Sequence, residues 1–152
     1  MNILTEARLA LEARLQTITV ANGYRTNAGQ NVKTGWLNEL LEQAGVGFPL
    51  ICIQKAKWQQ PMAGPGVIKA APGFSVVGSV DAGLHEYDGA LEDLELDLLQ
   101  CLLPEHGAFL PWAPPGVVST VLGAPEEFPP GKGARVASVL IPVHLHTIIN
   151  GD

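Results

Sequence analysis

The segment ARVASVLIPVHLHTI, residues 134–148, alternates apolar side chains with other side chains over most of its length. Successive side chains of a β-strand point to opposite faces of a sheet, so this pattern predicts a strand. Its apolar face carries Ala137, Val139, Ile141, Val143 and Leu145, and its other face carries Ser138, Leu140, Pro142, His144 and His146. The first face is expected to cover a hydrophobic core.

Pro142 restricts where this strand can lie in a sheet. Proline has no N–H group to donate, so it is expected on an edge strand or at a bulge. A long apolar edge strand, here Val136 to Ile149, exposes unpaired backbone groups that invite pairing with another chain. We therefore expect another molecule to cover the final strand.

His144 and His146 lie two residues apart on the same predicted face. Such a pair can bind zinc, but a closed site needs further ligands. The other histidines, His85 and His106, flank an acidic segment, and nothing in the sequence brings them to the strand. The main interpretation is a partly exposed strand face without metal or cofactor. The alternative is a small metal-dependent enzyme that uses His144 and His146 with a carboxylate from the acidic segment.

Two amphipathic helices are predicted from apolar residues spaced three and four apart. The first begins after Asn2, a suitable N-cap, and its apolar stripe comprises Leu4, Ala7, Leu11, Leu15 and Ile18. The second lies within LHEYDGALEDLELDLLQCLLP, residues 84–104, and is expected to end at Pro104. Its stripe comprises Leu84, Tyr87, Leu91, Leu94, Leu98 and Leu102.

The acidic residues of the second helix are expected to face water. They are Glu86, Asp88, Glu92, Asp93, Glu95 and Asp97. Asp88, Glu92 and Glu95 are spaced so that their carboxylates could hold a divalent cation or act as an acid/base pair. Charged residues between leucines are, however, typical of the solvated face of a helix, and this is the interpretation we adopt.

The remaining segments predict further strands and loops. Strands are expected at YRT (24–26), FPLICIQKAKW (48–58), FSVVGSV (74–80) and VVSTVLG (117–123). A short helix is expected at GWLNELLEQAG (35–45), ended by Gly45, and an exposed loop or irregular hairpin arm at residues 59–73. This order predicts one α+β domain over residues 1–152, with helices packed on one face of a largely antiparallel, mixed sheet.

Composition excludes several classes of protein. A chain of 152 residues that is 47% hydrophobic can bury a core as one domain. A net charge of −6 argues against nucleic-acid binding, and no apolar run approaches a membrane span. Charged residues interrupt the N-terminal segment, which therefore does not resemble a signal peptide. Cys52 and Cys101 lie in apolar runs typical of buried thiols.

No motif of an enzyme is present in the sequence. The GPG and GKG segments lack the glycine spacing that binds phosphates. Ser75, Ser79, Ser119 and Ser138 lie in strand-like runs without the turn that exposes a nucleophilic serine. We therefore expect that the protein is not an enzyme.

Four features together resemble one known family. They are a Y-x-T-x-x-G turn at Tyr24, Thr26 and Gly29, the strand PLICI (49–53), the helix segment EDLELDL (92–98) and the final alternating strand. In this order they resemble the tail terminator and tail-completion proteins of long-tailed bacteriophages and prophages, which include the lambda-type minor tail protein.

The resemblance implies a structural subunit of the virion tail, assembled in the cytoplasm of the host bacterium. Six copies would form a ring on the tail tube, end its polymerisation and provide the surface that joins the head. The implied partners are other copies of the chain, the tail tube protein and the head–tail connector protein. A related head-completion or tail-adaptor protein is the alternative within the same class.

The resemblance marks no interface residue, so candidates come from physical arguments. Trp58 follows two lysines where a strand leaves the core, a position where an amphipathic aromatic residue often anchors an interface. It could equally cover the rim of the core. The candidates for partner binding are Lys55, Lys57, Trp58, Arg25, Lys33, Pro142, His144 and His146.

Overall fold

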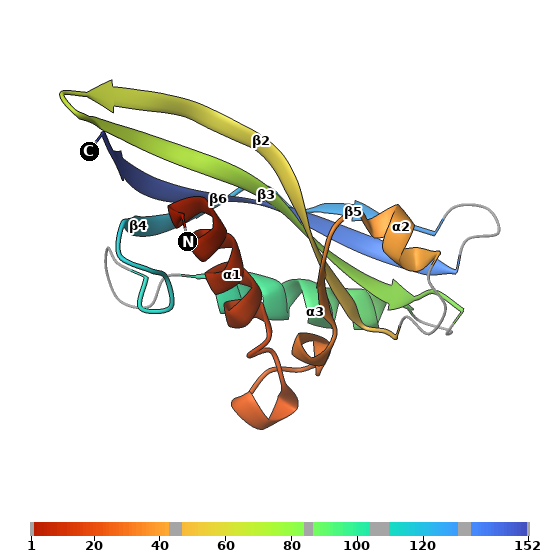
Figure 1. Ribbon diagram of the computed structural model, residues 1–152. Helices are drawn as coiled ribbons and strands as arrows, with labels where there is room; N and C mark the ends of the chain where they lie inside the picture. Colours follow the sequence, from red (N-terminus) through yellow and green to blue (C-terminus); the bar gives the residue numbers. More distant parts are fainter. Residues whose placement is uncertain (1, 43–46, 84–86, 104–109, 131–134, 152) are drawn as a thin grey trace.

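The computed structural model describes residues 2–42, 47–83, 87–103, 110–130 and 135–151 (Figure 1). Its helices are α1 (Ile3–Leu15), α2 (Leu37–Leu41) and α3 (Tyr87–Leu102), with short 3-10 turns η1 (Val20–Asn22) and η2 (Ala28–Gln30). Its strands are β1 (Val32–Thr34), β2 (Leu50–Gly64), β3 (Val67–Asp81), β4 (Val117–Leu122), β5 (Glu126–Phe128) and β6 (Val136–Asn150). The predicted α+β class is confirmed.

The strands form one open, mixed sheet in the order β1-β2-β3-β6-β4, and β5 also pairs with β6. β1 is parallel to β2, and the other neighbours are antiparallel. Long ladders join β2 to β3 and β3 to β6, for example Ile53 opposite Val76 and Val76 opposite Ile141. The largely antiparallel sheet predicted from the sequence is therefore present.

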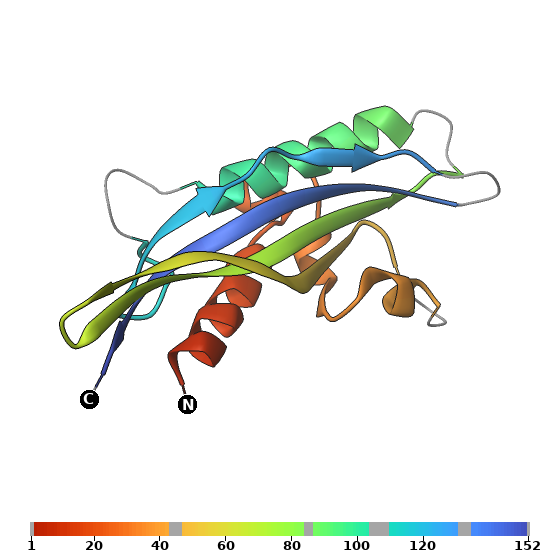
Figure 2. The same cartoon turned by 90° about the horizontal axis from the view of Figure 1, so that it is seen from above.

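Helices α1 and α3 cover one face of the sheet (Figures 1 and 2). The buried residues between them and the strands include Leu11 of α1, Leu94 of α3 and Ile141 of β6. The helix approaches β3 closely at Gly78, where an added Cβ would lie 2.8 Å from Cδ2 of Leu94. A Cβ at this position would force the leucine side chains of α3 to shift, because real side-chain atoms do not approach so closely.

The short helix α2 lies on the opposite face. Its Leu40 packs against Cys52 and Val77, whose neighbours Ile51 and Val76 point toward α1 and α3. The expectation that helices pack on one face therefore holds for the two long helices and not for α2. The predicted end of α2 at Gly45 lies outside the described residues.

Helix α3 follows its predicted pattern, and α1 follows its own in part: Ala7, Leu11 and Leu15 are buried, but Leu4 is 38% exposed and the buried Ile18 lies beyond the end of the helix at Leu15. The side chain of Asn2 caps α1 by accepting a hydrogen bond from the backbone N–H of Thr5 at 2.8 Å. The leucine stripe of α3 is buried from Leu91 to Leu102. Leu84, Glu86 and Pro104 lie outside the described residues. Asp97 contradicts the prediction that all acidic residues of this helix face water, because its side chain is fully buried.

β6 is an interior strand, so the predicted edge position is wrong. β3 pairs with one side of it, and β4 and β5 pair with the other. Pro142 lies where the chain crosses from β4 to β5, and Gly123 donates its N–H to the Pro142 carbonyl at 2.8 Å. The N–H and C=O groups of a strand residue point to the same side of the strand. The N–H that Pro142 lacks would therefore point to the gap between β4 and β5, where no ladder hydrogen bond is lost. The strand therefore needs no second molecule to cover it.

Other segments complete the comparison with the sequence prediction. Tyr24–Thr26 forms no strand; it is a turn bound to α3. Residues 59–73, predicted as a loop or hairpin arm, belong largely to the β2–β3 hairpin, whose tip extends beyond the helices (Figure 1). The short strands β1 and β5 were not predicted. Cys52 and Cys101 are buried free thiols, as expected.

Candidate interaction surfaces

Asp97 is the most extensively bonded charged side chain among the described residues. Its carboxylate accepts hydrogen bonds from the backbone N–H groups of Arg25 and Thr26 and from the Thr26 hydroxyl, at 2.8–3.1 Å. The Arg25 guanidinium forms an ion pair with it at 3.1 Å and also donates to Gln100. Arg25, a predicted partner-binding residue, is thus engaged within the chain. The sequence feature connected with this contact is that Thr26 and Asp97 belong to two motifs of the family resemblance.

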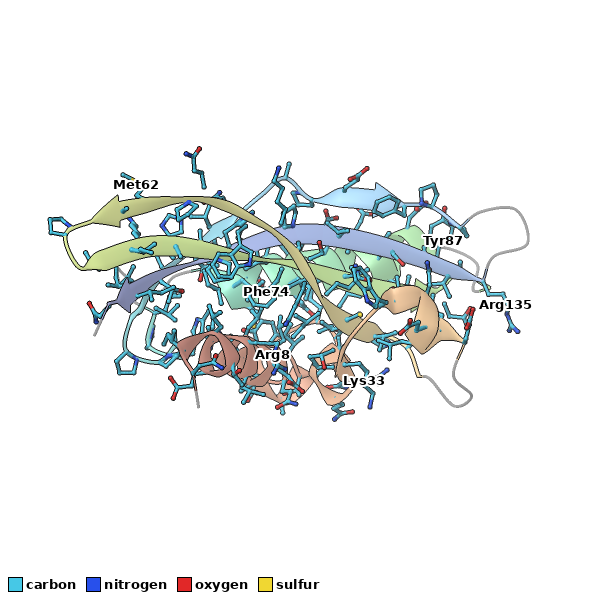
Figure 3. All side chains as sticks on the ribbon, turned by 45° about the horizontal axis from the view of Figure 1, so that its top comes forward. Arg8, Lys33, Met62, Phe74, Tyr87 and Arg135 are labelled. Carbon is cyan, nitrogen blue, oxygen red and sulfur yellow. The ribbon has the colours of Figure 1, made fainter. Side chains whose placement is uncertain are left out.

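A groove lies between the first half of α1 and the β1–β2 edge of the sheet. It consists of two adjoining hollows of about 130 and 290 Å³, and both are lined by Arg8 of α1 and Lys55 of β2. The other lining residues used below are Leu4, Thr34, Trp36 and Trp58. We call this the cationic groove. Figure 3 shows Arg8 on α1 near Phe74 of β3, which lines the same hollow.

Arg8 and Lys55 have no carboxylate within 4 Å among the residues the structure describes, where the single ion pair is Arg25 with Asp97. Trp36 and Trp58 remain 58% and 43% exposed beside these cations. A groove with two unpaired cations and two exposed indole rings can bind an anionic group and apolar side chains together. Of its residues, sequence reasoning identified Lys55 and Trp58 and missed Arg8 and Trp36, which carry no local signal.

Lys57 lies in a β-bulge, where β2 has an extra residue relative to β3. The bulge places the Lys57 carbonyl over Gly73, where a Cβ would collide with it. The Nε2–H group of His144 donates to this carbonyl at 3.2 Å. Bulges and lysines are features that protect an edge strand from unwanted pairing. Lys57 and His144, both predicted partner-binding residues, therefore stabilise the base of the hairpin.

His144 and His146 point away from α3. Their neighbours Val143 and Leu145 belong to the core that α3 covers, so the histidine side chains lie on the other face of the sheet. The carboxylates of α3 cannot reach them through the sheet. Within the described residues no group of three or more potential metal ligands is found, and His85 and His106 lie outside them. The arrangement proposed for a metal-dependent enzyme thus lacks its acidic helix ligand.

Burial, with smaller effects of Lys69 and His144, lowers the pKa of His146. Its Nε2 atom is buried without a hydrogen-bond partner in the described structure. A neutral imidazole is therefore favoured at this position.

An acidic surface lies along the opposite edge of the sheet from the cationic groove. It comprises Glu92 and Glu95 of α3 and Glu127 of β5, and we call it the acidic edge. Burial raises the pKa of Glu95, and a hydrogen bond with Glu127 and repulsion by Glu127 and Glu92 raise it further. These carboxylates are therefore crowded in the isolated chain.

The structure brings only some of the predicted partner-binding residues together. Lys55 and Trp58 share the cationic groove, and Lys33 is exposed on the neighbouring strand β1. Pro142, His144 and His146 lie on the other face of the sheet, and Arg25 is bound to α3. The eight residues therefore do not form one continuous site.

Comparison of the sequence with protein-family models and with curated proteins gave no match. Among the described residues, no helix is long and apolar enough to cross a membrane.

Proposed function

We propose that the chain is a structural protein of a bacteriophage tail, which ends polymerisation of the tail tube and provides a surface for joining the head. The proposal rests on the family resemblance and on surfaces suited to assembly. Two motifs of that resemblance contact each other, because Thr26 of the first is hydrogen-bonded to Asp97 of the second. They therefore belong to one structural unit.

The observation that carries the proposal is the projecting β2–β3 hairpin. Residues 57–69 form an arm with three exposed apolar side chains, Trp58, Met62 and Ile68, and Met62 is 71% exposed. A protruding hairpin that presents apolar side chains is typical of a surface that binds another protein. In the proposed function this arm contacts the tail tube, neighbouring copies of the chain or the head–tail connector.

The test is disruption of the gene in the phage or prophage that encodes the chain, followed by electron microscopy of the lysate. We expect tails of irregular, extended length and heads without tails, because nothing would stop the growing tube. Supplying the unaltered chain should restore tails of uniform length joined to heads. A chain with Met62→Asp and Ile68→Asp should fold but fail to restore them.

Two other outcomes have different meanings. Tails of normal length that are not joined to heads would assign the chain to the head-completion or tail-adaptor class. Normal particles in the absence of the chain would overturn a role in tail assembly.

A further inference from the structure

The two lateral edges of the sheet carry opposite charge. The cationic groove lies at the β1–β2 edge, and the acidic edge lies at β5, on the far side of β3 and β6. Figure 2 shows β5 and α3 along one side of the molecule and β2 along the other. The two charged surfaces therefore cannot meet within one chain.

We propose that the cationic groove of one copy of the chain binds the acidic edge of a second copy. The contact pairs Arg8 and Lys55 with the carboxylates of Glu92, Glu95 and Glu127. It deepens the proposed function, on which it rests for its biological meaning, because it supplies the lateral joint between copies.

Charge is the first argument for a second copy as the occupant. Arg8 and Lys55 line the same two hollows without an acidic partner in the described structure, so an incoming carboxylate would relieve their repulsion. On the acidic edge, Glu95 is crowded by Glu92 and Glu127, and an incoming cation would relieve that repulsion in the same way. Each surface therefore has the chemistry that the other lacks.

Apolar side chains beside the charges support the same pairing. Trp36 and Trp58 are exposed at the groove, and Leu96 is 41% exposed beside the acidic edge. Leu96 lies one helical turn beyond Glu92 on α3. Stable interfaces combine buried aromatic or aliphatic side chains with charged groups around them.

The placement of the two surfaces also determines the symmetry of the assembly. A two-fold dimer joins identical patches, whereas surfaces on opposite edges join head to tail. Head-to-tail contacts close into a ring if the rotation between copies allows it, and otherwise extend as a filament. A nucleic-acid phosphate is a poorer occupant because the chain carries a net charge of −6.

The test is a charge exchange between the two surfaces of the full chain. Lys55→Glu and Glu92→Lys should each weaken self-association about tenfold or more, as for other close interfacial charge pairs. Glu39→Lys on α2 is the matched control, because this residue is exposed and lies outside the two surfaces and outside the hairpin arm. Association is measured by sedimentation velocity over a concentration series, and thermal melts establish that each variant is folded.

The double variant with both Lys55→Glu and Glu92→Lys should recover association, since the exchanged charges again meet their opposites on the next copy. An equimolar mixture of the two single variants should recover it for the same reason. The inference is overturned if the wild-type chain stays monomeric up to its solubility limit, if the single variants behave like the control, or if neither exchange restores association.

Failure of the proposed function gives a different result. If self-association depends on these charges but tails form normally after the gene is disrupted, the contact between copies is supported and the role in tails is contradicted. Loss of tail control by disruption of the gene, together with single variants that associate normally, would remove only this contact.

Discussion

At the residue scale, Asp97 links two distant parts of the sequence. Its buried carboxylate binds the turn at Arg25 and Thr26 to α3, and five hydrogen-bonding contacts saturate it. Burial of a carboxylate is costly unless it is paired and hydrogen-bonded, and here both conditions are met. The segment between α1 and β1 therefore depends on one side chain of α3 for its position.

Replacing Asp97 with Ala should lower the free energy of unfolding by about 2–4 kcal/mol, since the backbone donors of Arg25 and Thr26 lose a charged acceptor. Denaturant unfolding followed by circular dichroism measures the change. Asp93→Ala is the matched control on the same helix, and as an exposed site it should change stability by no more than about 0.5 kcal/mol. Equal effects of the two substitutions would contradict the role assigned to Asp97.

Glu95 should make stability depend on pH. Its pKa in the folded chain lies above the ordinary value of 4.5, so the folded state holds this proton to higher pH than the unfolded state does. The contribution of Glu95 to the free energy of unfolding is therefore lost as pH rises from about 4.5 through the raised pKa, and it is regained as pH falls. Glu95→Gln should be more stable than wild type at pH 7.

The comparison at low pH completes this test. Below the ordinary pKa of 4.5, Glu95 is protonated in both states, and the advantage of Glu95→Gln should disappear. Thermal melts at several pH values measure it, with Glu39→Gln on α2 as the control. A Glu95→Gln variant that is less stable than wild type at pH 7 would show that the glutamate ionises favourably at this position.

At the scale of elements, α3 shows how one helix serves both the core and the surface. Leu94 and Leu98 are fully buried against β3, whereas Glu92 is exposed at the acidic edge. The 3.6-residue period separates these roles around the helix. The same element therefore stabilises the fold and presents charge to a partner.

Replacing Leu94 or Leu98 with Ala should cost about 2–5 kcal/mol, because a fully buried leucine leaves a cavity. Replacing Glu92 with Ala should change stability by no more than about 0.5 kcal/mol. Urea titration of the three variants compares them. A larger loss for Glu92 than for Leu94 would mean that the faces of α3 are assigned the wrong way round.

Trp58 tests the role of β2 where the strand leaves the core. Its side chain is partly exposed beside Arg8 and Lys55, so truncation removes only part of its contact with the chain. Trp58→Ala should weaken self-association more than it lowers monomer stability, measured by light scattering and by thermal unfolding. The reverse ranking would assign Trp58 to the rim of the core.

At the scale of the whole molecule, the reason for self-association differs from the one expected from the sequence. An exposed apolar edge at β6 was expected, but β6 is flanked by β3 on one side and by β4 and β5 on the other. The edges available to another copy are those of β1–β2 and β4–β5, which close the two sides of the sheet. Their opposite charge, rather than a bare apolar strand, is the basis for head-to-tail contact.

The chain should self-associate into a closed ring, and six copies are expected from the family resemblance alone. Light scattering over a concentration series measures the mass, and electron microscopy shows the shape of any oligomer. A ring with another number of copies would support the head-to-tail contact and contradict only the number six, which comes from the family resemblance. A chain that remains monomeric at every concentration would contradict both.

The two long helices and the long strands could be predicted from the sequence because their signals are local. The spacing of apolar residues in segments 3–18, 87–102 and 136–148 predicts which side chains are buried, because each element turns most of these residues toward one core. The same patterns predicted an α+β domain, and apolar surroundings predicted that Cys52 and Cys101 are buried. For the candidate site, they identified Lys55 and Trp58 and no other residue of the cationic groove.

Tertiary structure alone decided the position of β6 in the sheet, the burial of Asp97 and the composition of the cationic groove. Each depends on residues far apart in the chain: Pro142 with Gly123, Asp97 with Thr26, and Arg8 with Lys55. A local pattern specifies which face of an element is apolar, but it does not specify which strands flank it. The environment of a charge or a proline is set by those neighbours, and only the folded chain brings them together.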